Sequence, residues 1–322
     1  AIATDDELRA WVEQETHATV TGWRQIAGGN RSRSWAVTLR ANGATSGVYL
    51  RYQPPRPPSV EPYTVRREAA VYRALEGSHV PAPLLLAVHP HHDAIVTELK
   101  PGRAEYRSLT DDRELRDIAR DFAHALAALH TTNYAERSIP GLVPGMRIAD
   151  CVRAEIGIWD AMYRETGRPD ALIEFAVRWL RENLPDPAGP PVLVHGDAGP
   201  GNFLFDQGRL SALIDWELAH AGDPMEDLAW FSMRSVMEPV PDFIGAIRDY
   251  ERATGVPVSV ARIRYHRVFV STRVVIIRHR NVTGLPGNAI VSRALNQRLL
   301  VDAIADAAGV ALSVPEPLQS DP

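Results

Sequence analysis

The stretch that decides the fold is VLVHGDAGPGNFLFDQGRLSALIDW, which runs from Val192 to Trp216. Short apolar runs alternate here with glycines and polar residues, and this pattern is typical of short strands joined by turns. Asp197, Asn202 and Asp215 fall at the ends of the expected strands. Catalytic and binding residues are concentrated in such loops on a rigid scaffold. The stretch is therefore the first candidate for a functional site.

The spacing of the three polar residues predicts that their side chains converge. The residues between Asp197 and Asn202 are Ala-Gly-Pro-Gly, a turn-forming sequence that can fold Asn202 back beside the aspartate. Gln207-Gly208 separates two apolar runs and predicts the turn of a hairpin. Such a hairpin would deliver Asp215 to the same place as Asn202.

Two carboxylates and an amide oxygen are the groups that phosphoryl transfer requires. One carboxylate accepts or orients the proton of a hydroxyl group, and oxygen ligands hold magnesium against the nucleotide phosphates. Any one of these residues alone could be an ordinary turn or cap residue. Their joint occurrence between apolar strands favours catalysis.

Longer motifs around these residues resemble those of a known family. His195-Gly-Asp197 with Asn202, followed by Ile214-Asp215-Trp216-Glu217 and Gly222-Asp223-Pro224, resembles the aminoglycoside phosphotransferase and choline kinase-like family. Within it, Leu50-Arg51-Tyr52-Gln53-Pro54-Pro55 is most similar to the kinase domains that occur fused to, or encoded near, acyl-CoA dehydrogenases.

This resemblance implies an α+β, two-lobed protein-kinase-like fold with a small antiparallel-sheet N-lobe and a larger, mainly helical C-lobe. The change from a strand-rich to a helical pattern places the lobes at residues 1–100 and 101–322. The implied activity is ATP-dependent transfer of the γ-phosphate to a hydroxyl of a small molecule. Asp197 would be the base, Asn202 and Asp215 would bind Mg²⁺, His195 would be structural, and Glu217 would support the site from behind.

Gly28-Gly29-Asn30 precedes an alternating strand containing Trp35, Val37 and Leu39. It therefore occupies the place of a loop whose backbone amides cover the nucleotide phosphates. A plain turn between two strands is the alternative interpretation.

The strand from Val48 to Tyr52 is expected to carry the residue that contacts the phosphates, usually a lysine in kinases. Lys100 is the only lysine among 35 basic residues, so Arg51 takes that position. Arginine binds phosphate oxygens bidentately but is wider than an ammonium group. Glu68, in a predicted helix from Val65 to Leu75, is its expected partner, although both residues could also simply be solvated.

The apolar run Ile95–Leu99 followed by Lys100-Pro-Gly predicts the last strand of the small lobe and a hinge. We expect the backbone from Glu98 to Lys100 to bind the adenine ring. The cluster His89-Pro90-His91-His92-Asp93 suggests a zinc site, but its position between two apolar runs favours a hairpin loop.

Three segments of the second half predict helices. Apolar residues recur at helical spacing from Leu115 to Leu129 and from Leu172 to Leu180. Asp223-Pro-Met-Glu226 predicts a capping box at the start of another helix. Asp223 and Asp227 are accordingly interpreted as scaffold residues.

Six arginines crowd the helical stretch from Arg262 to Arg280. If some of them face the cleft, they favour an anionic acceptor over a cationic aminoglycoside. The alternative is that they lie on solvated helix faces.

Composition limits the other function classes. A net charge of −5 and a pI near 6.1 argue against general binding of nucleic acid. No apolar run approaches the roughly 20 residues that span a bilayer, and the lone Cys151 fits a reducing compartment. We therefore expect a cytoplasmic protein with no membrane partner.

Two other functions remain open from the sequence. The missing lysine and short glycine loop allow a pseudokinase-like protein that binds nucleotide without transfer. A two-metal phosphoesterase is a third possibility, but its site needs several more histidines near strand ends.

Overall fold

The computed structural model of the chain describes residues 2–26, 32–134, 137–143, 145–281 and 287–311. The predicted phosphate loop at Gly28, Gly29 and Asn30 lies outside these ranges.

The N-terminal part is built on one antiparallel sheet with the strand order β1-β2-β3-β5-β4. Its elements are α1 (Asp5–Thr16), β1 (Thr19–Ile26), β2 (Arg33–Ala41), β3 (Ala44–Gln53), α2 (Val65–Leu75), β4 (Leu85–Val88) and β5 (Asp93–Glu98). Trp35, Val37 and Leu39 of β2 are all buried, as their alternation predicts. The cluster His89–His92 forms the turn between β4 and β5, so the expected hairpin loop is confirmed.

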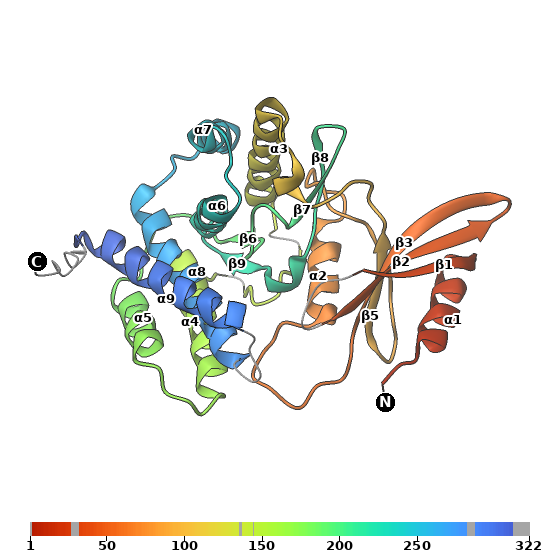
Figure 1. Cartoon of the computed structure of the whole chain (residues 1–322), viewed down its shortest axis with the longest axis horizontal. Helices are drawn as coiled ribbons and strands as arrows, with labels where there is room; N and C mark the ends of the chain where they lie inside the picture. The colour runs from red at the N-terminus through yellow and green to blue at the C-terminus, as the bar shows by residue number, and fades with distance from the viewer. Residues whose placement is uncertain (1, 27–31, 135–136, 144, 282–286, 312–322) are drawn as a thin grey trace, which may run out of the picture.

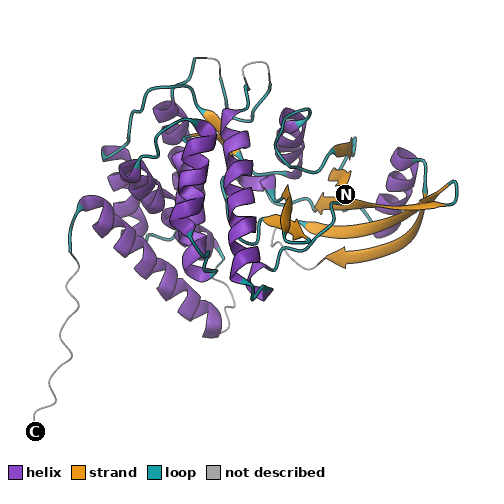
Figure 2. Cartoon of the chain, turned by 90° about the horizontal axis from the view of Figure 1, so that it is seen from above, coloured by secondary structure: helices purple, strands orange, loops and turns teal. Residues whose placement is uncertain are grey.

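The rest of the described chain is mainly helical and lies beside the sheet (Figures 1 and 2). Its helices are η1 (Tyr106–Ser108), α3 (Asp112–Thr131), α4 (Ile148–Arg164), α5 (Ala171–Glu182), η2 (Trp216–Leu218), α6 (Met225–Met237), α7 (Phe243–Thr254), α8 (Val260–Arg280) and α9 (Gly287–Ala308). Two small ribbons interrupt them: β6 (Val192–Val194) pairs with β9 (His220–Gly222), and β7 (Phe203–Asp206) with β8 (Arg209–Leu213). The predicted α+β, two-lobed fold is confirmed.

The β7–β8 hairpin turns where the sequence predicts. Gln207 and Gly208 have φ values of 48° and 74°, both in the left-handed region that two-residue hairpin turns use. Glycine meets this requirement without strain. The turn pairs Asp206 with Arg209, and a register shift between Leu204 and Phe205 then places Phe203 opposite Leu213. Asn202 and the chain after Leu213 therefore emerge at the same end.

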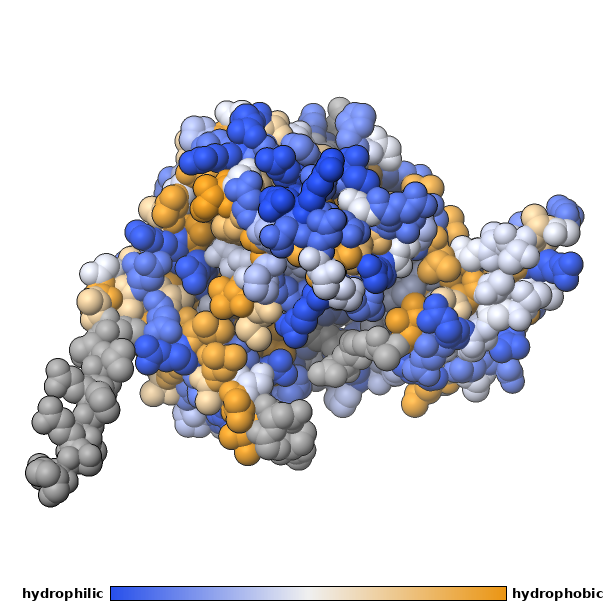
Figure 3. Space-filling view, turned by 45° about the horizontal axis from the view of Figure 1, so that its top comes forward, coloured by the Kyte–Doolittle hydropathy of each residue, from blue (hydrophilic) through white to orange (hydrophobic). Residues whose placement is uncertain are grey.

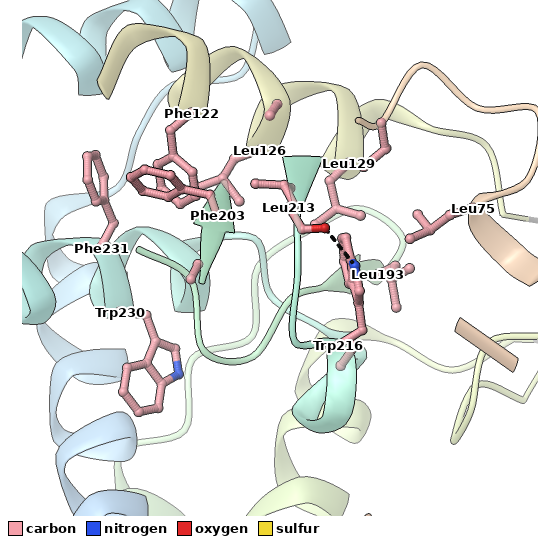
Figure 4. Close-up of a cluster of buried hydrophobic side chains, with 14 of the residues drawn as sticks. Leu75, Phe122, Leu126, Leu129, Leu193, Phe203, Leu213, Trp216, Trp230 and Phe231 are labelled. Carbon is pink, nitrogen blue, oxygen red and sulfur yellow. Dashed lines mark hydrogen bonds between the residues drawn. The ribbon is translucent and has the colours of Figure 1, made fainter. Parts of the chain in front are cut away.

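An aromatic cluster fixes this hairpin against α3 (Figure 4). The Phe122 ring lies 5.0 Å from Phe203 and 4.9 Å from Phe231, measured between ring centroids. At the same open end of the hairpin, Trp216 donates from Nε1 to the carbonyl oxygen of Leu213, the residue that pairs with Phe203, at 3.2 Å. The side chains of Phe122, Phe203, Phe231 and Trp216 are almost fully buried. Large buried rings dominate core energetics, so the ends of the hairpin are held rigidly.

The surface gives no sign of a membrane-spanning segment. In the described parts of the chain, every helix is too short or too polar to cross a bilayer. The face shown in Figure 3 is largely hydrophilic, with separate hydrophobic groups over the helical part.

Candidate active site

Asn202 lies directly against Asp197. Its Nδ2 donates to the backbone oxygen and to Oδ2 of Asp197, both at 2.7 Å. The tight loop between them is closed by a hydrogen bond from the Asn202 amide to the Gly199 carbonyl at 3.1 Å. The predicted approach of these two residues is therefore confirmed.

A buried carboxylate holds the start of this loop. Asp227 of α6 accepts the backbone N–H of His195 at 2.8 Å and that of Gly196 at 2.9 Å. His130 of α3 contacts the same carboxylate at 3.0 Å. Burial alone would raise the pKa of Asp227, but the hydrogen bond and charge of His130 keep it below its ordinary value. This geometry matches the scaffold role that the sequence predicts for Asp227.

Gly196 could not be replaced without moving the backbone. Its φ is +78°, and a Cβ atom there would lie 2.3 Å from the carbonyl oxygen of Leu218. The loop from His195 to Asn202 and η2 are therefore in backbone contact. This contact brings Asp215, the residue before η2, close to the loop. His195 adds a second link, because its Nε2 lies 2.9 Å from the carbonyl oxygen of Ile214.

Asp215 has a left-handed backbone, with φ at 64°. Non-glycine residues in this region are uncommon and occur often at functional sites. Its Oδ1 accepts a hydrogen bond from Arg51 Nη1 at 2.8 Å. Burial would raise the pKa of Asp215, but the positive charge of Arg51 holds it below its usual value.

Arg51 of β3 binds three carboxylates, one on α2 and two in the segment 215–217, and so joins the sheet to that segment. The predicted pair with Glu68 is present at 3.3 Å, and the contacts to Asp215 and Glu217 are 2.8 and 2.7 Å long. The Arg51 side chain is only 8% exposed, so it is not the solvated strand residue of the alternative interpretation. Burial outweighs the attraction of Arg51 and raises the pKa of Glu68 to about 7.

A cleft of about 470 Å³ lies between the sheet and the segment 201–215. Arg51, Asn202 and Asp215 line it, as do Glu98 and Lys100 of the predicted hinge. Lys100 forms an ion pair with Glu98 at 2.9 Å. The volume lies in the range of small-molecule and cofactor sites. Asp197 is not part of this lining and reaches the cleft through its contact with Asn202.

One residue of the site has no signal in the motifs discussed above. Arg234 of α6 forms a bidentate pair with Asp197, with Nε 3.1 Å from Oδ1 and Nη2 2.6 Å from Oδ2. It lies 37 residues after the aspartate, on a helix. The apolar pattern of this stretch explains why a helix forms there but does not indicate the partner of Arg234. Only the folded arrangement brings the two side chains together.

None of the six arginines from Arg262 to Arg280 is among the residues that line this cleft, and four of them have carboxylate partners. Arg273 is fully buried and binds Glu226 and the carbonyl oxygen of Gly196. Arg262 binds the buried Asp223. Two others pair elsewhere, Arg264 with Asp306 and Arg280 with Glu61 and Glu165. Sequence position alone could not reveal these distant partners.

The predicted capping box is wrong in its second half. Asp223 does accept the backbone N–H of Met225 at 2.9 Å. Glu226, however, does not return to the start of the helix, because Arg273 and His220 bind its carboxylate inside the protein. A buried charge takes the partner that compensates it best.

Histidines in the described ranges do not assemble a hydrolytic metal centre. His220 lies 3.3 Å from Glu226 and His266 lies 3.2 Å from Asp223, so both belong to buried structural pairs. Across the described ranges, no cluster of three or more histidine, cysteine or acidic residues could hold a metal ion. The phosphoesterase alternative therefore has no support from this part of the chain.

Comparison of the sequence with known proteins identifies the family. Residues 22–260 match the profile of the APH phosphotransferase enzyme family, and the chain belongs to this family. Human acyl-CoA dehydrogenase family member 11 is 31% identical over 196 residues, which cover 57% of this chain and 25% of that protein. The chain thus corresponds to about a quarter of the length of this relative.

Solved structures confirm the fold. A thermostable mutant of aminoglycoside phosphotransferase APH(4)-Ia, in a ternary complex with ADP and hygromycin B, has a TM-score of 0.65 and 19% identity, covering 94% of this chain and 99% of that chain. ADP-bound aminoglycoside phosphotransferase APH(2'')-Ib has a TM-score of 0.57 and 16% identity, covering 93% and 99%. At these identities the likeness establishes the kinase-like fold.

Proposed function

We propose that this phosphotransferase moves the γ-phosphoryl group of ATP to a hydroxyl group of a small molecule. The observation that carries the proposal is the convergence of Asp197, Asn202 and Asp215 at one end of the β7–β8 hairpin. Asn202 and Asp215 line the cleft together with Arg51. Phosphoryl transfer needs this set of groups, and holding them in the right positions lowers the barrier to the reaction.

Asp197 is the proposed base. The acceptor oxygen forms a bond to the γ-phosphorus, and the bond from that phosphorus to the β,γ-bridging oxygen breaks, so ADP leaves with the electron pair. The proton of the acceptor hydroxyl passes to the Asp197 carboxylate. A base must lie within about 2.6–3.2 Å of the oxygen that it deprotonates, and the 21% exposure of this side chain leaves room for that contact.

Asn202 and Asp215 fit a magnesium site. Within the described residues, Asn202 Oδ1 and Asp215 Oδ2 have no hydrogen-bond partner, and both side chains line the cleft. Mg²⁺ prefers such oxygen ligands and usually takes only one or two from protein side chains, with substrate phosphates and water completing its shell. When bound, the ion would neutralise charge on the phosphates.

Arg51 and the hinge would hold the nucleotide. We assign Arg51 to the phosphates and its partner Glu68 to the orientation of Arg51, as the ion pair at 3.3 Å supports. The backbone from Glu98 to Lys100, which lines the same cleft, is the proposed adenine contact. Gly28, Gly29 and Asn30 are proposed to cover the phosphates, and residues 1–100 and 101–322 to form the two lobes.

The acceptor is proposed to be a small hydroxylated compound. The APH(4)-Ia complex contains hygromycin B, which supports this class of acceptor without fixing its identity for this chain. A cytoplasmic location and the lack of a nucleic-acid partner stay predictions of the sequence.

One observation favours a second candidate, a protein that binds nucleotide without transferring phosphate. Arg234 occupies both oxygens of the proposed base in this structure. If that pair persisted with nucleotide bound, it would hinder proton transfer to Asp197.

Turnover separates the two candidates. ADP release is measured with MgATP and a panel of hydroxylated compounds, and compared between the wild type and Asp197→Asn. A kinase predicts acceptor-dependent ADP release that falls at least about 100-fold in the variant, while affinity for MgATP stays nearly constant. Tight MgATP binding without ADP release across the panel would favour the second candidate.

A further inference from the structure

Arg234 binds the proposed base and the loop that follows it through three hydrogen bonds. Its Nε and Nη2 bind the two carboxylate oxygens of Asp197, and its Nη1 donates to the carbonyl oxygen of Pro200 at 2.9 Å. All three guanidinium nitrogens thus bind the catalytic loop. The side chain is still 27% exposed, so it is not sealed off from solvent.

The loop is shaped to receive this side chain. Gly199 has a φ of +142°, and a Cβ atom there would lie 2.7 Å from Cδ of Arg234. On its other side the guanidinium lies 5.9 Å from the ring centre of Trp230. A glycine where the arginine crosses the loop and an aromatic ring behind it fix the cation in place.

The contacts leave Asp197 one free acceptor position. A carboxylate has about four acceptor positions, and Arg234 occupies one on each oxygen while Asn202 takes another on Oδ2. The remaining position, on Oδ1, suits the acceptor hydroxyl. In a productive complex the attacked phosphorus lies about 3–3.5 Å beyond that hydroxyl oxygen. The transferred group would therefore lie within reach of the Arg234 guanidinium.

Arg51, the arginine assigned to the nucleotide phosphates, is already paired. Arg51 binds Glu68, Asp215 and Glu217, and its charge is balanced by these carboxylates. Arg234 binds one carboxylate and is partly exposed. Charge on the equatorial oxygens of a transferred phosphoryl group is commonly stabilised by an arginine, and this effect is worth about 10³–10⁵ in rate.

We propose that Arg234 is a catalytic residue that contacts the transferred phosphoryl group, acting as an arginine finger supplied within the chain. The inference rests on the proposed kinase function. As the bond from the γ-phosphorus to the bridging oxygen breaks and the bond to the acceptor oxygen forms, Arg234 stabilises the oxygens of the group in transit. The proton still passes to Asp197.

The test uses aluminium fluoride, which with MgADP imitates a phosphoryl group in transit and needs no acceptor. Calorimetry gives the dissociation constant of MgADP with and without aluminium fluoride for the wild type, Arg234→Gln and Arg234→Lys. Arg264→Gln is the matched control, because Arg264 is an exposed arginine paired with Asp306 at 3.3 Å. Thermal unfolding shows that each variant is folded.

The wild type and the control are expected to bind MgADP at least about 100-fold more tightly with aluminium fluoride. Arg234→Gln should lose this gain while its affinity for MgADP alone changes less than about threefold, and Arg234→Lys should regain part of it. Retention of the gain in Arg234→Gln overturns the inference. So does an equal loss of MgADP binding itself, which marks a merely structural role, or a wild type that binds MgADP but gains nothing from fluoride. Failure of the wild type to bind MgADP contradicts the proposed function itself.

Discussion

Replacing Arg273 by methionine should destabilise the protein strongly, because this arginine compensates a buried charge. Arg273 and Glu226 are both fully buried and form an ion pair, and Arg273 Nη2 also binds the carbonyl oxygen of Gly196 at 2.9 Å. The guanidinium further lies 4.9 Å from the ring centre of Trp159. Removing one partner of a buried ion pair typically costs about 3–5 kcal/mol. Methionine retains part of the packing, so most of this cost would come from the Glu226 carboxylate, which would keep only His220 of its two buried partners.

The assay is equilibrium unfolding in urea at pH 7, with the free energy of unfolding extrapolated to zero denaturant. Arg264→Met on the same helix is the control, and its exposed pair should change stability by less than about 1 kcal/mol. The double variant Arg273→Met with Glu226→Gln should regain part of the loss, because the carboxylate that Arg273 compensates is removed as well. A loss below about 1 kcal/mol in Arg273→Met, equal to that of the control, would refute the reasoning.

Three further predictions concern the loop, the sheet and the core. Gly196→Ala should lower the melting temperature far more than Gly77→Ala, since both have positive φ but a Cβ at Gly77 meets nothing within 4 Å; equal effects would contradict the contact with η2. The pKa of Glu68, raised to about 7 from its ordinary 4.5, means that folding favours the protonated carboxyl, so this stabilising contribution is fully present below pH 4.5 and is lost as pH rises through 7. Relative to Glu68→Gln, the wild type should therefore lose up to about 3 kcal/mol of unfolding free energy between these limits, and a flat difference would show that Glu68 stays charged. Phe203→Ala should cost about 3–5 kcal/mol and Phe175→Ala, at a side chain 44% exposed, much less; similar urea midpoints would argue against the aromatic cluster as the anchor of the hairpin.

Local sequence signals were enough to predict the β7–β8 hairpin. Gln207-Gly208 meets the backbone requirement of its turn, and the small residues before Asn202 allow the approach to Asp197 at 2.7 Å. These features depend on neighbours in the sequence, so their physical cause can be read directly. The alternation of β2 and the helical spacing of α3 were informative for the same reason.

Long-range pairing of charges could not be predicted in this way. Arg234 and Arg273 lie on helices whose sequence explains only why helices form there, and their partners are 37 and 47 residues away. In a chain with a single lysine, arginine serves structural and site roles alike. Only burial and partner geometry distinguish the fully buried Arg273 from the partly exposed Arg234.

The most direct test of the kinase site is calorimetric titration of ATP in the presence of magnesium and in the presence of EDTA, on the wild type and on Asp215→Ala. We predict binding that depends on magnesium in the wild type and is lost or becomes magnesium-independent in the variant, because Asp215, which lines the cleft, is proposed to supply an oxygen ligand to the ion. Absence of ATP binding by the wild type, or equal magnesium-dependent binding by both proteins, would contradict it.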